Sequence, residues 1–143
     1  TVAMLLEKGA DVNAKDIFGK TILMEATSWG HTKTVAILLE KGADVNAYLW
    51  GDTALMMASA EGQTETVSVL LEKGADVNAR DWNGDTALNI ARKHGHTEIV
   101  SLIKKHMILK TALIIKKGLT QKGNKPLVPY AHRETIHRIA SFF

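Results

Sequence analysis

The sequence predicts an all-α solenoid, in which antiparallel helix pairs stack side by side and short β-hairpin fingers join them. The first observation is that the segment GADVNA occurs three times, at 9–14, 42–47 and 74–79. The second is the spacing, which is 33 residues from Gly9 to Gly42 and 32 residues from Gly42 to Gly74. A period of this length is typical of repeat architectures, whose units bury a continuous core only by stacking.

Each unit is expected to open with an extended finger and a first helix. A threonine precedes every expected first helix and can cap its free backbone N–H groups; these residues are Thr21, Thr53 and Thr86. A glycine follows each of these helices and can close it in a left-handed conformation; these residues are Gly30, Gly62 and Gly95. The sequence therefore predicts both ends of the first helix in every unit.

The second helix of each unit carries the clearest apolar face. Threonines mark its expected start, at Thr32, Thr64 and Thr97. Val35, Leu38 and Leu39 are spaced by three and four residues, which places them on one side of a helix. Gly42 or Gly74 is expected to end the helix. The Asp-Val-Asn that follows each GA pair suits a turn, because Asp and Asn side chains bond to nearby backbone groups.

The fingers differ in length. Their glycines are Gly19, Gly51 and Gly84, and they follow the preceding GADVNA glycine by 10, 9 and 10 residues. The middle finger is therefore one residue short, and it lacks the aspartate found at Asp16 and Asp81. We expect the turn to absorb this deletion, because length variation is tolerated in loops.

The helix-opening motifs are TILM at 21–24, TALM at 53–56 and TALN at 86–89. With these motifs, the closing glycines and the LLEKGADVN runs, the units resemble ankyrin repeats over about residues 1–106. The resemblance implies paired antiparallel helices, hairpin fingers and a partner bound along the fingers and first helices. The Pro and His that the family usually has in the helix-opening motif are absent. The resemblance therefore does not imply, for this chain, the hydrogen-bond ladder that this His supports between fingers.

The predicted organisation is a repeat array followed by a different segment. The array covers 1–106, as a half-repeat at 1–14 and repeats at about 15–46, 47–78 and 79–106. Lys104 replaces the Leu39 and Leu71 of earlier units, which suits a terminal face. Residues 107–143 form a basic C-terminal extension, with a capping helix at 107–117, then a Gly- and Pro-containing linker and a short helix from 132.

Charge divides the chain at the same place. The 143 residues carry a net charge of +3, but residues 1–103 hold 9 Lys/Arg and 14 Asp/Glu, whereas residues 104–143 hold 9 Lys/Arg and only Glu134. Such asymmetry suggests an anionic partner for the tail, or the array itself as that partner. There is no cysteine, so a disulfide framework and a thiolate metal site are excluded. The absence of cysteine favours a cytoplasmic location.

Aromatic and aliphatic residues at the finger tips are the main candidates for partner recognition. Tips are usually polar, and each aromatic side chain carries roughly 150–250 Å² of surface. Several such residues along one edge would form the kind of patch that marks an interaction site. The alternative is that neighbouring tips, or the tail, cover them. The predicted partner-binding residues at or beside the tips are Ile17, Phe18, Lys20, Tyr48, Leu49, Trp50, Asp52, Trp82, Asn83 and Asp85.

The C-terminal ends of the first helices supply further candidates. Trp29, Glu61 and His94 occupy equivalent places there, and positions of this kind often face the ligand in the family that the chain resembles. A lone Trp can equally pack against the adjacent unit. Met24, Met56 and Met57 could form an adaptable binding stripe, but at helical spacing they are more often core.

The patterns of catalytic and metal sites do not occur in this sequence. Residues 81–85 begin like a calcium loop, but Thr86 and Arg92 stand where Gly and Glu are required. His94 and His96 flank a glycine and are expected to point apart, which argues against a metal site. There is no phosphate-binding glycine motif, so no cofactor is predicted. We expect no enzyme activity.

The sequence thus favours a non-catalytic protein–protein interaction module, which we expect to be monomeric and to bind another protein of unknown identity. One alternative is an electrostatic tether, in which the basic tail binds nucleic acid or an anionic membrane. The simpler interpretation of the tail is a solvated surface, because runs of charged residues usually only keep a surface hydrated. Another alternative is a regulatory fragment of a larger enzyme.

Overall fold

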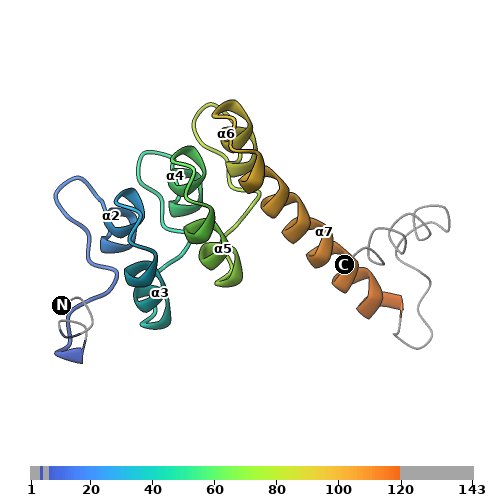
Figure 1. The fold of residues 1–143 in the computed structure, drawn as a ribbon. Helices are drawn as coiled ribbons and strands as arrows, with labels where there is room; N and C mark the ends of the chain where they lie inside the picture. Colours follow the sequence, from blue (N-terminus) through green and yellow to red (C-terminus); the bar gives the residue numbers. More distant parts are fainter. Residues whose placement is uncertain (1–3, 5–6, 120–143) are drawn as a thin grey trace. The chain divides into compact units, whose positions relative to one another are not determined.

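The computed structural model describes Met4 and residues 7–119, and within them it confirms the all-α repeat fold. The first helices are α2 (Ile22–Ser28), α4 (Ala54–Ala60) and α6 (Ala87–Lys93), and the second helices are α3 (Thr32–Glu40), α5 (Thr64–Glu72) and α7 (Thr97–Leu119). Figure 1 shows them in chain order. The chain divides into two compact units, Thr1–Leu102 and Ile103–Phe143. The first unit holds the paired helices.

The predicted helix ends are confirmed in all three repeats. The Thr21 side chain accepts a hydrogen bond from the backbone N–H of Met24 at 3.3 Å, and Thr53 and Thr86 make the same bond three residues ahead. Such a bond satisfies one of the donors that every helix start leaves free. Gly30 follows α2 with a φ of 70°, a conformation that glycine adopts at little cost. The three first helices therefore begin and end at equivalent residues.

The core lies between the helix pairs. Val35 and Leu38 of α3, and Val67 and Leu70 of α5, are fully buried, which confirms the predicted apolar face. α2 and α4 contact each other, as do α4 and α6, and α3 and α5. First helices therefore pack against first helices, and second helices against second helices. Leu39, which shares the predicted face, is only half-buried.

The repeats are also joined by asparagine side chains, a contact that the sequence patterns did not predict. The Asn13 side chain donates to the Gly42 carbonyl at 3.1 Å and accepts from the Asp44 N–H at 2.7 Å. Asn46 makes the same pair of bonds to Gly74 and Asp76, at 3.4 and 2.8 Å. An amide has both a donor and an acceptor, so one side chain can satisfy both backbone groups. Each asparagine thus fixes the register of the following unit.

These asparagines join the GADVNA segments of successive repeats, whereas the family's helix-opening His links neighbouring fingers. Met24 and Met56 stand at the position of the family's helix-opening His, and both are buried. A thioether is at best a weak acceptor. These methionines contribute apolar packing instead. This agrees with the expectation that methionines at helical spacing are more often core residues.

A second contact between units covers the ends of the first helices α2 and α4. The His96 ring lies over Gly62, so that a Cβ added to Gly62 would come within 2.7 Å of it. The His96 Nε2 lies 3.0 Å from the Ala60 carbonyl, to which it donates. Gln63 occupies the equivalent place one unit earlier, beside Gly30. Its Oε1 is buried and has no hydrogen-bond partner among the described residues.

Helix α7 extends beyond the point where α3 and α5 end. Gly42 and Gly74 close those helices with φ values of 93° and 90°, and Met107 stands at the corresponding position of the third unit. A methionine adopts this left-handed conformation only at a cost, so the helix continues to Leu119. Residues 107–117 are helical, and their role as a cap stays a prediction. Gly118 and Leu119, which were predicted to begin the linker, are helical instead, because α7 runs to Leu119. The rest of the predicted linker and the helix from 132 lie outside the described residues.

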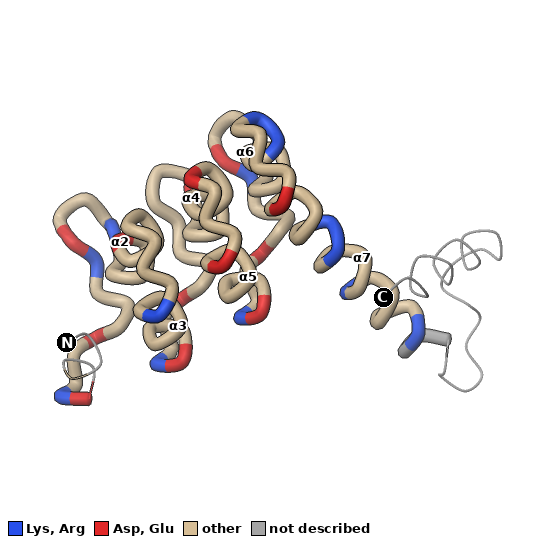
Figure 2. The backbone as a smooth tube through the Cα atoms, in the orientation of Figure 1, with Lys and Arg blue, Asp and Glu red and all other residues tan. Residues whose placement is uncertain are grey.

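The second of the two compact units, Ile103–Phe143, consists over its described residues of the later part of α7. Its apolar residues Leu113 and Ile114 are exposed, and so are Lys104, Lys105, Lys110 and Lys116. Figure 2 shows basic residues along this part of α7. None of the helices that the structure describes has the length and apolar character needed to span a bilayer.

The burial pattern predicts the stability of core variants. Leu70→Ala should lower the free energy of unfolding by about 2–5 kcal/mol, because it leaves a cavity between two neighbouring units. Leu39→Ala should cost less, because Leu39 keeps part of its side chain in water. Denaturant melts of both variants test this, and an equal or reversed order would contradict the packing described.

The contrast between Gln63 and His96 predicts a stabilising change. Gln63→His should raise the free energy of unfolding by about 1 kcal/mol, because the ring can donate to the Ser28 carbonyl as His96 does to that of Ala60. Thermal melts of this variant and of His96→Gln provide a matched pair. The second variant should be less stable than the parent, and a gain in stability from it would disprove this explanation.

Candidate protein-binding site

The first and third fingers share one turn geometry. The Asp16 carboxylate accepts from the Phe18 and Lys20 N–H groups, both at 2.9 Å, and the Gly19 N–H donates to the Asp16 carbonyl at 3.0 Å. Asp81 makes equivalent bonds in the third finger. An aspartate that bonds its own turn in this way fixes the loop. The two residues that follow each of these aspartates therefore lie at the tip.

The middle finger uses a tighter turn. Leu49 and Asp52 exchange two backbone hydrogen bonds of 2.9 and 3.0 Å around only two residues. Those residues, Trp50 and Gly51, have φ values of 51° and 86°. Positive φ at both central positions defines a type I′ hairpin turn, for which Asn-Gly is the preferred sequence. The one-residue deletion is thus absorbed by the turn, as expected, and it places a tryptophan in a left-handed conformation.

The apolar tip residues remain largely in solvent. Ile17 is 93% exposed, Trp50 66% and Trp82 80%, and Phe18 and Tyr48 are also exposed. Neighbouring fingers do touch, because Leu49 approaches Gly19 and the edge of the Trp82 indole lies against Gly51. These contacts cover little of the aromatic rings. Leu49 is half-buried and is best described as a contact between fingers.

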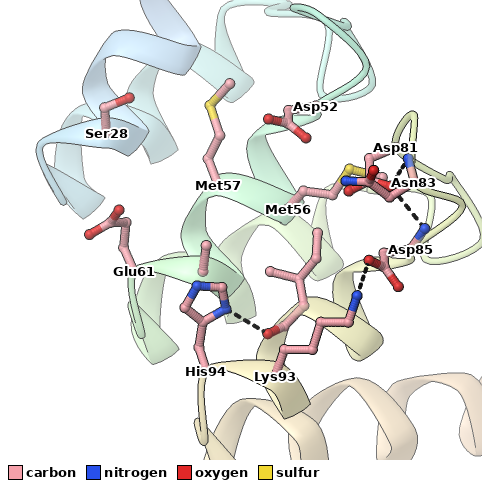
Figure 3. A pocket seen from close by; sticks show the side chains of 12 residues that line it. Ser28, Asp52, Met56, Met57, Glu61, Asp81, Asn83, Asp85, Lys93 and His94 are labelled. Atoms are coloured by element: carbon pink, nitrogen blue, oxygen red, sulfur yellow. Dashed lines mark hydrogen bonds and ion pairs between the residues drawn. The ribbon is translucent and has the colours of Figure 1, made fainter.

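A groove lies below the tips, between the second and third fingers and the first helices. Its volume is about 470 Å³, and Figure 3 shows the side chains around it. Five predicted site residues line it: Asp52, Glu61, Asn83, Asp85 and His94. The remaining predicted residues are not in its lining: Ile17, Phe18, Lys20, Trp29, Tyr48, Leu49, Trp50 and Trp82. The structure therefore separates the candidates into a groove and a surrounding edge.

The groove also contains residues that were not predicted as site residues: Ser28, Met56, Met57, Ala60, Asp81, Ile90 and Lys93. Met57 and Ile90 precede Glu61 and His94 by four residues, so they lie on the same helix face. That spacing was the available signal for two of the missed residues. Met56 is almost fully buried, so it belongs both to the core and to the floor of the groove.

Carboxylates dominate the charge of the groove. Asp85 is paired with Lys93, and the Asp81 carboxylate accepts from the Asn83 and Asp85 N–H groups. Burial raises the pKa of the Asp52 carboxyl above its ordinary value, and the nearby Asp81 charge raises it further. Both causes disfavour the ionised form of Asp52. The groove therefore holds a carboxylate whose charge is poorly compensated in the free protein.

Lys20 and Trp29 meet at Glu25, outside the groove. Glu25 accepts from the Trp29 Nε1 at 2.7 Å and pairs with Lys20 at 2.5 Å. The hydrogen bonds from Lys20 and from Trp29 lower the pKa of the Glu25 carboxyl, in that order of effect. Because all three side chains are at least partly exposed, the pair contributes little to stability. It does hold Trp29 in a defined position at the surface.

The two histidines around Gly95 do not point apart as expected. Their rings are nearly parallel, with centroids 6.1 Å apart. The His94 Nδ1 lies 2.9 Å from the Ile90 carbonyl, and His96 is bonded to Ala60. No group of three potential metal-ligating side chains occurs among the described residues.

Comparison with protein-family models gives two matches. A model described as ankyrin repeats (3 copies) matches residues 1–81, and a model of a single ankyrin repeat matches residues 83–108. The chain belongs to the ankyrin-repeat family. A comparison with curated protein sequences found no match. Ankyrin repeats are in general non-catalytic modules for protein–protein interaction, so the fingers and groove of this ankyrin-repeat chain are candidates for the contact with a partner protein.

The strained turn of the middle finger predicts a simple change in stability. Trp50→Asn should raise the free energy of unfolding by about 1 kcal/mol, because Asn tolerates the left-handed conformation better than Trp does. Trp82→Asn is the matched control, because position 82 carries no positive φ. Denaturant melts should show a gain at position 50 only, and a loss at both positions would show that the tips contribute to stability by packing.

Proposed function

We propose that this ankyrin-repeat chain is a non-catalytic binding module that holds a partner protein against its finger tips and the groove beneath them. The edge residues Phe18, Trp50 and Trp82 supply apolar contact area, and the groove supplies polar groups. This arrangement matches the general anatomy of protein interfaces, in which aromatic anchors provide much of the binding energy.

The observation that carries this proposal is the conformation of Trp50. Its backbone is strained and its side chain is 66% exposed, so the free protein gains little from this residue. A small residue would suit the turn better. Strain that is not compensated locally is often found at functional positions, and a partner that covers the Trp50 ring supplies the missing compensation.

The described titratable groups support a binding role over a catalytic one. The groove's aspartates are engaged in turns or ion pairs, apart from Asp52. No serine or threonine among the described groove residues is bonded to a base, an arrangement that nucleophilic catalysis requires. Ser28, the hydroxyl residue of the groove, donates to the Met24 carbonyl.

An electrostatic tether is the second candidate, favoured by the basic residues of α7. Lys104, Lys110 and Lys116 are exposed, and no acidic residue follows Glu98 in this helix (Figure 2). Binding of phosphates through these residues would weaken steeply with salt. Binding through the aromatic edge would depend less on salt, so a salt titration separates the two candidates.

Single substitutions at the edge test the proposed function. Trp50→Asn and Trp82→Ser should each weaken binding of a captured partner protein by about 2 kcal/mol or more, because each removes an aromatic anchor. Leu113→Ser is the control, because it removes an exposed apolar side chain outside the array. The measurement is a titration of partner with each variant, alongside its melting curve.

The stability expected for Trp50→Asn makes this experiment decisive. A variant that folds at least as well as the parent and still binds weakly has lost a contact and not its fold. Unchanged affinity in both tryptophan variants would show that the fingers are not the binding surface.

A further inference from the structure

We propose that the groove beneath the second and third fingers receives a lysine or arginine side chain from a basic, extended segment of the partner protein. This inference rests on the proposed function and adds the chemistry of the segment that is bound. The charged end would lie beside the Asp52 and Asp81 carboxylates, and the alkyl stem would lie on Met57 and Ile90.

The charge of the groove determines the sign of the occupant. Four carboxylates line it, from Asp52, Glu61, Asp81 and Asp85, against the single ammonium of Lys93. Lys93 is already paired with Asp85, and His94 is bonded to the Ile90 carbonyl. An anionic group such as a phosphate or a carboxylate would be repelled here. A cation would find a complementary potential.

A bound cation would stabilise the ionised carboxylate of Asp52 in particular. Among the described residues, no side chain or backbone group donates a hydrogen bond to its carboxylate, and no ion pair includes it. Its half-buried position and the neighbouring Asp81 charge both disfavour its ionised form. An ammonium or guanidinium placed between the two carboxylates would remove their repulsion and supply donors to both. Asp81 contributes its charge but is already committed to the turn of the third finger.

The floor of the groove suits the rest of a long basic side chain. Met56, Met57 and Ile90 add apolar surface to the lining of the groove, and Figure 3 shows Met56 and Met57 near Asp52. Lysine and arginine bury their alkyl stems on such surface while the charged end stays near polar groups. The volume of about 470 Å³ lies within the range of about 300–1,000 Å³ that is usual for ligand pockets. An acidic groove with a polar floor would instead favour a hydrated cation.

The edge above the groove favours a peptide over a small free amine. Trp50 and Trp82 belong to the two fingers that bound the groove, and both are exposed. Neighbouring residues of a bound segment would reach these rings, and a second basic residue could make a cation–π contact with either of them. A free amine would fill the groove and leave the edge uncovered. The inferred occupant is therefore a segment with at least one basic residue and apolar neighbours.

The experiment is selection from a displayed library of random dodecapeptides on the full chain, followed by affinity measurements with the recovered peptides. Recovered sequences should be enriched in Lys or Arg. Asp52→Asn should weaken their binding by about tenfold, because it removes one charge of a close pair and keeps the shape of the side chain. Glu72→Gln is the matched control: it removes one exposed carboxylate on α5, outside the groove, and should change affinity less than about twofold.

The outcomes separate this inference from the proposed function. The basic-segment proposal would be overturned if the peptides depend on Trp50 and Trp82 but carry no excess of basic residues. It would also be overturned if their affinity is unchanged by Asp52→Asn. In both cases the proposed binding function would still hold. An equal loss of affinity for Glu72→Gln would also overturn it, because the effect would then come from the overall charge of the array. Recovery of no peptide that depends on Trp50 or Trp82 would overturn both.

Discussion

The packing of each helix pair against the next is the interaction on which the rest of the array depends. α3 and α5 have only nine residues each, and helices this short are marginal by themselves. Their stability comes from Val35, Leu38, Val67 and Leu70, which are buried between neighbouring pairs. Asn13 and Asn46 then bond the start of the following unit. Because apolar contact and hydrogen bonding repeat at the same interval, every unit takes the same register, and the fingers are brought next to one another.

That register explains why a deletion in one finger leaves the helices unchanged. Thr53 caps α4 with the same bond and the same 3.3 Å distance as Thr21 and Thr86 in their helices. The interior of the repeat leaves no room for a shift by one residue, since such a shift would remove apolar side chains from the core. The turn has the freedom that the core lacks. It changes from an aspartate-bonded loop to a type I′ turn, and the local cost falls on Trp50.

Most of the fold could be predicted from sequence because it follows from residues that recur. The threonine caps, the closing glycines and the apolar face were each visible three times, and chance does not repeat a pattern in register. The hydrogen bonds of Asn13 and Asn46 to the following unit were not predicted, because turn formation already explains an asparagine at these positions. The extent of α7 beyond Met107 depends on a glycine that is absent, and it was only partly anticipated.

The candidate site was predictable to a lesser degree. Exposed tip residues such as Ile17 and Trp82 follow from finger position alone, and the structure keeps them in solvent. The groove brings together side chains from two fingers and from α2, α4 and α6, which lie far apart in sequence. Asp81 was noted as a finger residue and as the start of an incomplete calcium-loop pattern. The structure shows that its carboxylate bonds its own turn, and its effect on Asp52 depends on their proximity in three dimensions. Sequence patterns describe one unit at a time, and this groove exists only between units.

Two unfavourable features meet in the middle finger, at Trp50 and Asp52. The first is a backbone conformation that tryptophan adopts at a cost. The second is a carboxylate whose raised pKa shows that its charge is disfavoured in the folded chain. Since the folded pKa lies above the unfolded value, ionised Asp52 opposes folding at neutral pH, and this opposition disappears as the pH falls below both values. The corresponding positions of the first and third fingers carry no such strain, because Asp16 and Asp81 satisfy their turns. Unfavourable backbone conformation and unfavourable charge therefore occur together in the middle finger, beside a groove and an exposed aromatic edge. A bound segment that covers Trp50 and neutralises Asp52 would offset both costs at once, which is the physical reason to place recognition there.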